Sequence, residues 1–128
     1  MRLLLDTHTF LWWVANAPEL SHRARRAVGA RDNECFFSAA SCWEMAIKVS
    51  IGKLELEGTA ERFVPDQLAV NGFQELPVEI RHAARVSRLP FHHRDPFDRL
   101  LVSQAVEEDL TIVSADPIFR RYGLKPIW

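Results

Sequence analysis

The stretch LLLD, residues 3–6, is an unbroken apolar run that ends abruptly in a carboxylate. An apolar run without polar alternation is typical of a strand that is covered on both faces, as the strands of parallel sheets are. We therefore expect a buried strand over residues 2–6, with Asp6 at its carboxyl end.

Two more apolar runs, residues 35–37 and 110–113, have the same character, and the second leads through Ser114 to Asp116. Weaker signals predict strands within residues 73–78 and 124–128. Helical patterns fill the intervals: 9–15, a segment after Ser21, 39–51, 60–71 with an interruption or restart at Pro65, 79–87 and a segment from Pro96. Because parallel neighbours need crossover connections, this alternation predicts an α/β fold, a three-layer α/β/α domain with a mainly parallel central sheet.

Two polar residues mark the expected starts of helices. Ser21 is a suitable N-cap, and Asp95-Pro96 joins a capping carboxylate to a proline that suits the first helical position. Asp98 then falls in the first turn of that helix. Glu44 falls in the early part of the helix expected over residues 39–51.

Composition favours one soluble domain over residues 1–128. The chain is 48% hydrophobic and has a formal net charge of −1, so it can bury one core and carries no bulk charge that indicates a polyanion partner. Cys35 and Cys42 belong to no metal-binding motif, and we expect them to pack as small apolar groups. Without a signal-peptide core or a membrane-spanning apolar run, we expect a cytoplasmic protein with no membrane contact.

Four carboxylates from distant segments are expected to meet at one edge of the sheet. Asp6 and Asp116 follow strands, and ligands of such sheets bind outside the carboxyl ends of the strands. Glu44 and Asp98 lie in the opening turns of helices that can face the same crevice. Like charges this close are tolerable when a cation neutralises them, and oxygen donors without a Cys or His cluster suit Mg²⁺ or Mn²⁺.

Each acid also has an ordinary structural explanation. Asp6 and Asp116 could cap helices, and Asp98 could favour the positive end of its helix dipole. Glu44 could be a plain helix residue. A fifth acid, Asp95, is expected to cap a helix rather than to bind metal. Spacing alone leaves these alternatives open.

Four motifs resemble PIN domains of the VapC toxin type. They are LLLDTH at 3–8, SAASCWEMAIK at 38–48, HHRDPFDRLL at 92–101 and TIVSADP at 111–117, and together they cover nearly the whole chain. The family's acidic residues fall on Asp6, Glu44, Asp98 and Asp116. Two positions depart from the common pattern without removing a carboxylate: His8 stands where many members have Asn or Ser, and Ser114 where Thr is frequent.

The resemblance implies a Mg²⁺- or Mn²⁺-dependent endoribonuclease that acts as the toxin of a type II toxin–antitoxin pair. It also implies a homodimer, and a VapB-like antitoxin whose carboxyl-terminal segment lies across the active-site groove. Since the antitoxin carries the DNA-binding part, we expect this chain to contact DNA only indirectly. In the expected reaction, one or two cations activate water for attack on phosphorus and stabilise the departing 3′ oxygen.

Several neighbouring residues have candidate supporting roles. Thr7 and Ser114 could hydrogen-bond water around the cation or cap local turns. Arg94 and Arg99 could contact RNA phosphate, although solvated or ion-paired arginines are equally expected. His8, His92 and His93 could orient the substrate or transfer protons, but an ordinary surface or core role is the simpler expectation. Trp12 and Trp13 are expected to pack in the core, and a contact with the antitoxin or with a second subunit is the alternative.

Two rival functions remain open at this point. An aspartyl-phosphate phosphatase also begins with an apolar strand that ends in Asp, but such enzymes usually have a second Asp where this chain has His8. A catalytically silent PIN-like module that binds RNA or protein would not require a cluster of like charges.

Overall fold

The four strands form one parallel sheet. The computed structural model describes residues 1–128, and its sheet has the order β3-β2-β1-β4. Every neighbouring pair of strands is parallel. The strands are β1 (Arg2–Leu5), β2 (Glu34–Ser38), β3 (Gln74–Leu76) and β4 (Thr111–Val113).

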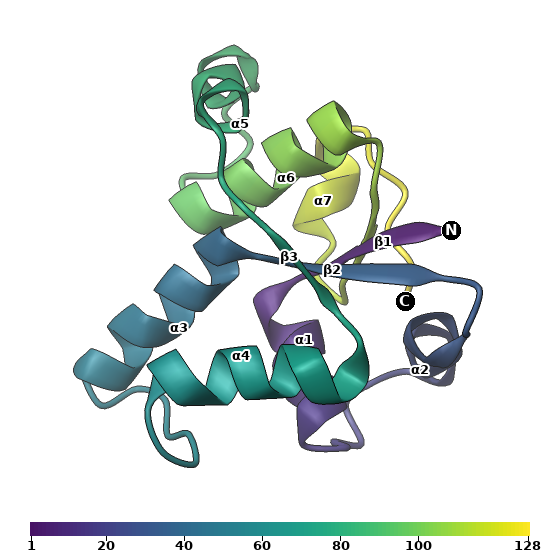
Figure 1. Cartoon of the computed structure of the whole chain (residues 1–128). Coiled ribbons are helices and arrows are strands. Elements are labelled where there is room, and N and C mark those ends of the chain that lie inside the picture. Colours follow the sequence, from purple (N-terminus) through teal and green to yellow (C-terminus); the bar gives the residue numbers. More distant parts are fainter.

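Helices cover both faces of this sheet (Figure 1). One layer contains α1 (Thr7–Val14), α2 (His22–Gly29), α3 (Ala39–Ser50) and α4 (Ala60–Asn71). The other contains α5 (Ile80–Arg85), a short 3-10 helix η1 (Val86–Arg88), α6 (Pro96–Glu108) and α7 (Ile118–Arg121). The predicted three-layer α/β/α fold with a parallel sheet is therefore confirmed.

The apolar run of β1 is explained by the two cores on which it borders. Leu3 and Leu5 belong to the core beneath the first helical layer, where Phe10 stacks on Phe37 with centroids 4.1 Å apart. Leu4 faces the opposite core, formed with α6 and α7. Because side chains alternate across a strand, all three leucines are buried only when helices cover both faces.

The strand order indicates the edge of the sheet at which such folds bind ligands. From the central strand β1, the chain crosses to β2 on one side, and β4 lies on the other side. In open α/β sheets, this kind of reversal leaves a gap between the helices at the carboxyl edge. Asp6 and Ser114 directly follow β1 and β4, and the Asp6 amide donates to the Val113 carbonyl at 3.3 Å.

The predicted caps at Ser21 and Asp95 are confirmed. The Ser21 side chain accepts a hydrogen bond from the Ala24 amide at 3.0 Å. One oxygen of Asp95 accepts from the amides of Phe97 and Asp98, at 2.8 and 3.1 Å. Asp98 is thereby fixed in the first turn of α6.

Three boundaries differ from the sequence prediction. α1 begins at Thr7, two residues earlier than predicted, because Asp6 caps it. The segment expected over residues 79–87 divides into α5 and η1. At the carboxyl end no full strand forms: a single parallel bridge joins Ile127 to Val113.

The predicted interruption at Pro65 is wrong, because α4 runs unbroken from Ala60 to Asn71. Proline removes one backbone donor, which leaves the Glu61 carbonyl without its helical partner. Since Glu61 is exposed, water can satisfy that carbonyl, and the helix continues. None of the helices combines the length with the apolar character that crossing a membrane requires.

Candidate active site

Asp6 is held at the carboxyl edge of the sheet by two hydrogen bonds. The residue is 7% exposed, and its Oδ1 accepts from the Thr9 amide at 2.8 Å. Its Oδ2 accepts from the buried Ser114 hydroxyl. Asp6 therefore caps α1, as the ordinary explanation expected, but its carboxylate is also fixed beside the end of β4.

Ser114 links two of the candidate acids. Besides donating to Asp6, its hydroxyl accepts from the Asp116 amide at 3.0 Å. Asp116 is exposed, and its Oδ1 accepts from the Ile118 amide at 2.9 Å, so this carboxylate caps the turn into α7. One buried hydroxyl thus sets the position of both acids that follow strands.

Glu44 reaches the same edge from α3. The Thr7 hydroxyl donates to its Oε1 at 2.6 Å, and the Lys48 ammonium contacts its Oε2 at 3.1 Å. Thr7 directly follows Asp6, so this bond ties Glu44 to the end of β1. One helical turn before Glu44, Ser41 has a buried hydroxyl without a hydrogen-bond partner in the protein.

Asp98 carries the clearest electrostatic sign of a functional site. Its pKa is raised from 3.8 to about 7, first because the carboxyl is buried and then because four other carboxylates repel its charge. Those carboxylates belong, in order of effect, to Asp95, Asp116, Glu44 and Asp6. Asp6, Glu44 and Asp116 thus all lie within electrostatic range of Asp98.

A short relay of side chains holds the exposed side of Asp98. The His93 Nε2 lies 3.3 Å from an Asp98 carboxylate oxygen, and the His93 Nδ1 lies 2.8 Å from the Tyr122 hydroxyl. The same hydroxyl accepts from the Arg99 guanidinium at 3.0 Å. Asp98 is thereby connected to α7 and to the loop before α6.

Arg99 does not contribute an exposed cation, contrary to the predicted phosphate contact. It is 4% exposed, and its guanidinium donates to the carbonyls of Pro90, Val86 and Leu89. The five donors of a guanidinium suit a loop that offers several carbonyls at once. Arg99 is thus neither solvated nor ion-paired: it fixes the loop that precedes α6. Arg94, by contrast, is exposed.

The remaining candidates divide between packing and exposure. Trp12 and Trp13 are half-buried against the core of the first helical layer, and the Trp13 indole donates to Asn71 at 2.9 Å. His8 is exposed and stacks on Trp12 at 5.5 Å between centroids. His92 packs edge-on against Tyr122. The tryptophans therefore have the packing role that was their simpler expectation.

The donors at the carboxyl edge suit a hard cation, although they are not gathered into a tight ligand set. All four offer carboxylate oxygens, and a cation would relieve the repulsion that raises the pKa of Asp98. The one group of three His, Cys, Asp or Glu side chains whose ligand atoms lie within 4.8 Å of one another is elsewhere: Glu79, His82 and Glu108. Metal binding at the four acids therefore requires side-chain rotation.

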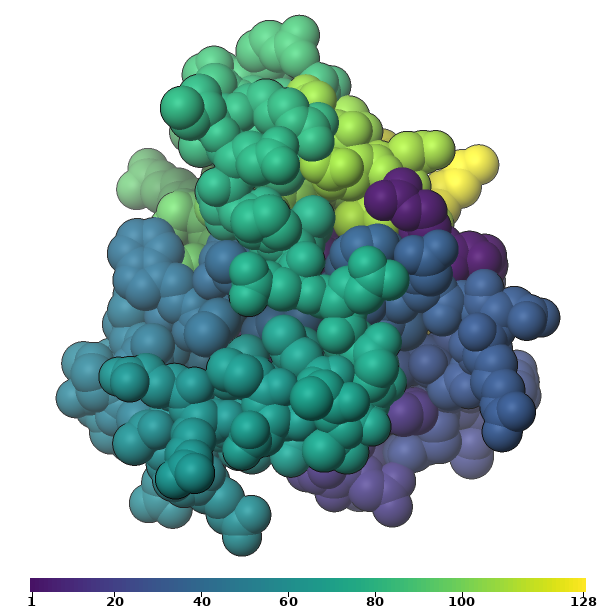
Figure 2. Space-filling view, in the orientation of Figure 1, coloured from purple at the N-terminus to yellow at the C-terminus, as the bar shows by residue number.

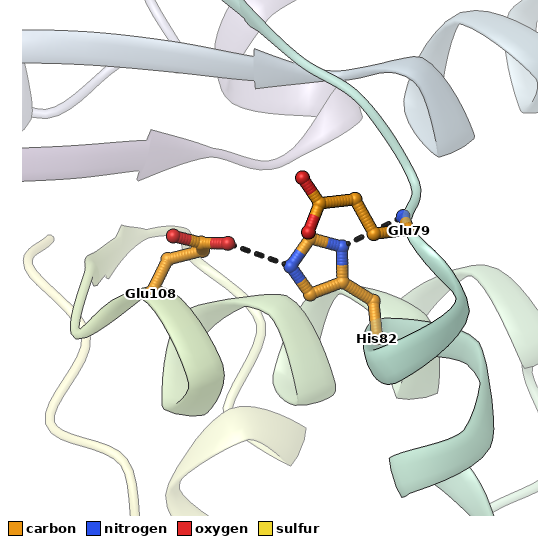
Figure 3. Close-up of side chains that lie close together, drawn as sticks. All are labelled: Glu79, His82 and Glu108. Atoms are coloured by element: carbon orange, nitrogen blue, oxygen red, sulfur yellow. Dashed lines mark hydrogen bonds and ion pairs between the residues drawn. The ribbon is translucent and has the colours of Figure 1, made fainter.

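That second group is a structural cap rather than a metal site (Figure 3). The His82 Nδ1 accepts from the Glu79 amide at 3.0 Å, so the proton of the neutral ring is on Nε2, which donates to Glu108 at 2.8 Å. A metal at Nε2 would have to displace this proton. The Arg81 guanidinium already neutralises the same carboxylates by pairing with Glu79 and Glu108.

A cavity on the α3 side of the molecule contains none of the four acids in its lining. It has a volume of about 560 Å³ and opens between α3 and α4, which lie against each other in Figure 2. Its lining is mostly apolar and includes Phe37, Ala46, Val64 and Leu68. Trp43 belongs to this lining, although it is 63% exposed, and touches Phe97 at the start of α6.

Sequence reasoning missed Lys48, Tyr122 and Ser41. The spacing of Glu44 and Lys48, four residues apart in a predicted helix, could have indicated their ion pair. Tyr122 gave no signal, because its contacts come from residues 29 and 23 positions away in sequence, His93 and Arg99. Ser41 is recognisable only from its burial.

The comparisons with known proteins agree with this geometry. The family model of the PIN domain matches residues 3–125. A chain in the crystal structure of VapBC2 from Rickettsia felis bound to a DNA fragment from its promoter has a TM-score of 0.70 at 16% identity, covering 100% of both chains. A chain in the crystal structure of FitAcB from Neisseria gonorrhoeae has a TM-score of 0.68 at 18% identity, covering 97% of this chain and 95% of that one. A chain of FitAB bound to the IR36 DNA fragment has the same TM-score and identity, covering 97% and 92%. No curated protein matches the sequence.

Proposed function

The chain belongs to the PIN domain family, and on that premise we propose that it is a metal-dependent endoribonuclease. In this proposal residues 1–128 act as one PIN domain that hydrolyses RNA phosphodiester bonds with Mg²⁺ or Mn²⁺. PIN domains are generally nucleases, so the general class follows from the family. The metal, the RNA substrate and the residue roles are specific to the proposal.

The observation that carries the proposal is the pKa of Asp98, raised to about 7 by burial and by four neighbouring carboxylates. Carboxylates that repel one another destabilise a fold unless a cation neutralises their charge. A strongly perturbed acid in a crevice is a candidate functional group for that reason. Here the acids lie at the carboxyl edge of a parallel sheet, where such folds bind ligands.

The four acids have distinct roles in the proposal. Asp6 supplies a fixed carboxylate, because the Thr9 amide and the Ser114 hydroxyl hold both of its oxygens. Glu44 is oriented by the Thr7 hydroxyl, and the ammonium of Lys48 forms an ion pair with it. Asp98 and Asp116 complete the set from α6 and from the turn after β4. When bound, Mg²⁺ or Mn²⁺ would supply the positive charge and the activation of water that hydrolysis of a phosphodiester needs.

We also propose that the chain is the toxin of a toxin–antitoxin pair, acts in the cytoplasm as a homodimer and is neutralised by a VapB-like antitoxin. The likeness in fold to chains of VapBC2 and FitAcB supports this assignment. The apolar cavity between α3 and α4, with exposed Trp43 at its lining, is the kind of surface that a protein partner covers. DNA contact would come through the antitoxin.

RNA cleavage by purified protein tests the enzymatic proposal. We expect cleavage in Mg²⁺ or Mn²⁺, none in EDTA, and none by Asp6→Asn or Asp98→Asn. Asp109→Asn is the matched control: it removes one negative charge from the exposed end of the same helix, at a φ of 53° that Asn tolerates, and should cleave normally. Cleavage by Asp98→Asn at the wild-type rate would refute the assignment.

Co-expression tests the partner. If a small open reading frame lies immediately upstream, we expect its product to copurify with this chain and to suppress its RNA cleavage. A product that copurifies and leaves cleavage unchanged would contradict the antitoxin role, while the nuclease assignment would stand.

A further inference from the structure

Phe91 is an aromatic ring held out into solvent beside the candidate active site. Its side chain is 83% exposed. The Cζ of Arg99 lies 4.3 Å from its ring centroid, so a guanidinium rests against the ring. A ring that is held against a cation while most of its surface stays in water can stack on a second planar group.

The backbone at Phe91 is fixed rather than loose. Arg99 donates to the carbonyl of Pro90, the residue directly before Phe91, at 2.8 Å, and to the carbonyls of Val86 and Leu89 at 3.3 and 3.4 Å. Arg99 itself is buried in the first turns of α6. Pre-organisation of this kind lowers the entropic cost of binding to the exposed ring.

The ring lies within a few side chains of Asp98. Arg99 is the next residue along α6 and donates to the Tyr122 hydroxyl at 3.0 Å. That hydroxyl lies 2.8 Å from the Nδ1 of His93, whose Nε2 is 3.3 Å from Asp98. A ligand group that stacks on Phe91 would therefore lie on the same side of the molecule as Asp98, linked to it through Arg99, Tyr122 and His93.

The charges around the ring suit a polyanion better than a protein core. Arg94, three residues along the same loop, is exposed, and so is Arg121, which donates to the carbonyl of His92 at 3.4 Å. Single-stranded nucleic acids bind through this combination of stacked aromatic rings and backbone-tracking cations.

From this arrangement we infer that Phe91, supported by Arg99, is a stacking platform for an unpaired nucleobase of single-stranded RNA. The inference deepens the proposed function and rests on it for the identity of the substrate. A stacked ring accepts any base, because every base offers a flat face. The platform therefore selects unpaired over paired RNA without selecting a particular sequence.

Fluorescence anisotropy of a labelled twelve-nucleotide single-stranded RNA, measured in EDTA to prevent cleavage, tests the platform. Phe91→Leu keeps an apolar side chain but removes the flat ring, and should weaken binding by about 5- to 50-fold. Phe91→Trp should bind at least as tightly as the wild type. The exposed Val70→Ala on α4 is the control, with unchanged binding expected.

An oligonucleotide of the same length without bases separates stacking from phosphate contacts. We expect wild type and Phe91→Leu to bind this abasic RNA equally. Equal binding of ordinary RNA by the two proteins, or an equal loss on abasic RNA, would overturn the platform. The platform would also be overturned if Phe91→Leu binds RNA like the wild type and loses only the binding of a protein partner.

The failure of the platform and the failure of the proposed function are distinguishable. If the wild type cleaves RNA with Mg²⁺ or Mn²⁺ and Phe91→Leu binds like the wild type, only the platform is wrong. If the wild type does not cleave and still binds single-stranded RNA through Phe91, the nuclease assignment is wrong and the platform stands.

Discussion

At the scale of single residues, Asp98 has an environment that opposes its own charge. Its pKa of about 7 means that the folded protein retains a proton there which the unfolded chain, with a pKa near 3.8, has already lost. Folding then becomes less favourable as the pH rises through the interval between these two values. Below pH 3.8 both states are protonated, and Asp98 contributes no pH dependence.

We predict that Asp98→Asn removes this penalty. In EDTA, the wild type should lose about 2–3 kcal/mol of unfolding free energy between pH 5 and pH 8 relative to Asp98→Asn, because each pKa unit corresponds to about 1.4 kcal/mol. Urea unfolding at the two pH values measures this difference. Asp109→Asn should behave like the wild type, and parallel pH profiles for wild type and Asp98→Asn would show that Asp98 ionises normally.

Ser114 illustrates how one hydroxyl can serve two acids. Removing it in Ser114→Ala leaves Asp6 with one hydrogen bond fewer and the Asp116 amide without its acceptor. We predict a loss of about 1–3 kcal/mol in unfolding free energy and a marked drop in RNA cleavage. Ser114→Thr keeps the hydroxyl and should retain both properties. A Ser114→Ala protein that cleaves RNA normally would contradict this role.

At the scale of elements, α5 is attached to α6 through His82. The ring is completely buried and joins the start of α5 to Glu108 at the end of α6, while Arg81 and Arg85 pair with Glu107 on the same helix. These contacts fix the helix that carries Asp98 from the end opposite to the acid.

We predict that His82→Ala costs about 2–4 kcal/mol of unfolding free energy, because it creates a cavity and leaves buried polar groups unpaired. His22→Ala, at the exposed first position of α2, is the matched control and should cost little. Thermal unfolding measures both. Because His82 is assigned a capping role, added Zn²⁺ should not stabilise the wild type through this residue; a zinc-dependent rise in midpoint that disappears in His82→Ala would contradict the assignment.

At the scale of the whole molecule, the sequence predicted those elements that local signals determine. The buried strands and the starts of α2 and α6 follow from unbroken apolar runs and from caps, which are local signals. Arg99 was misjudged because its position depends on contacts with three carbonyls, of Val86 in η1 and of Leu89 and Pro90 in the loop that follows. The bridge at Ile127 was overestimated as a strand for a related reason, since pairing with Val113 depends on tertiary geometry.

The candidate site was likewise predictable only in part. Acids that follow strands could be placed from topology, because parallel strands end at a common edge. The distances among them could not, because side-chain rotamers and partners such as Lys48 and Tyr122 set them. The structure shows the electrostatic effect of the other three acids on Asp98, whereas the closely spaced group of potential ligand atoms lies elsewhere, at Glu79, His82 and Glu108.

Calorimetric titration of the metal-free protein with Mn²⁺ at pH 7.5 tests the central claim, that these acids share one edge in order to hold a divalent cation. The account predicts saturable binding by the wild type and by Asp109→Asn, and strongly weakened binding by Asp98→Asn and Asp6→Asn. Absence of binding to the wild type, or binding of equal strength to Asp98→Asn, would contradict it.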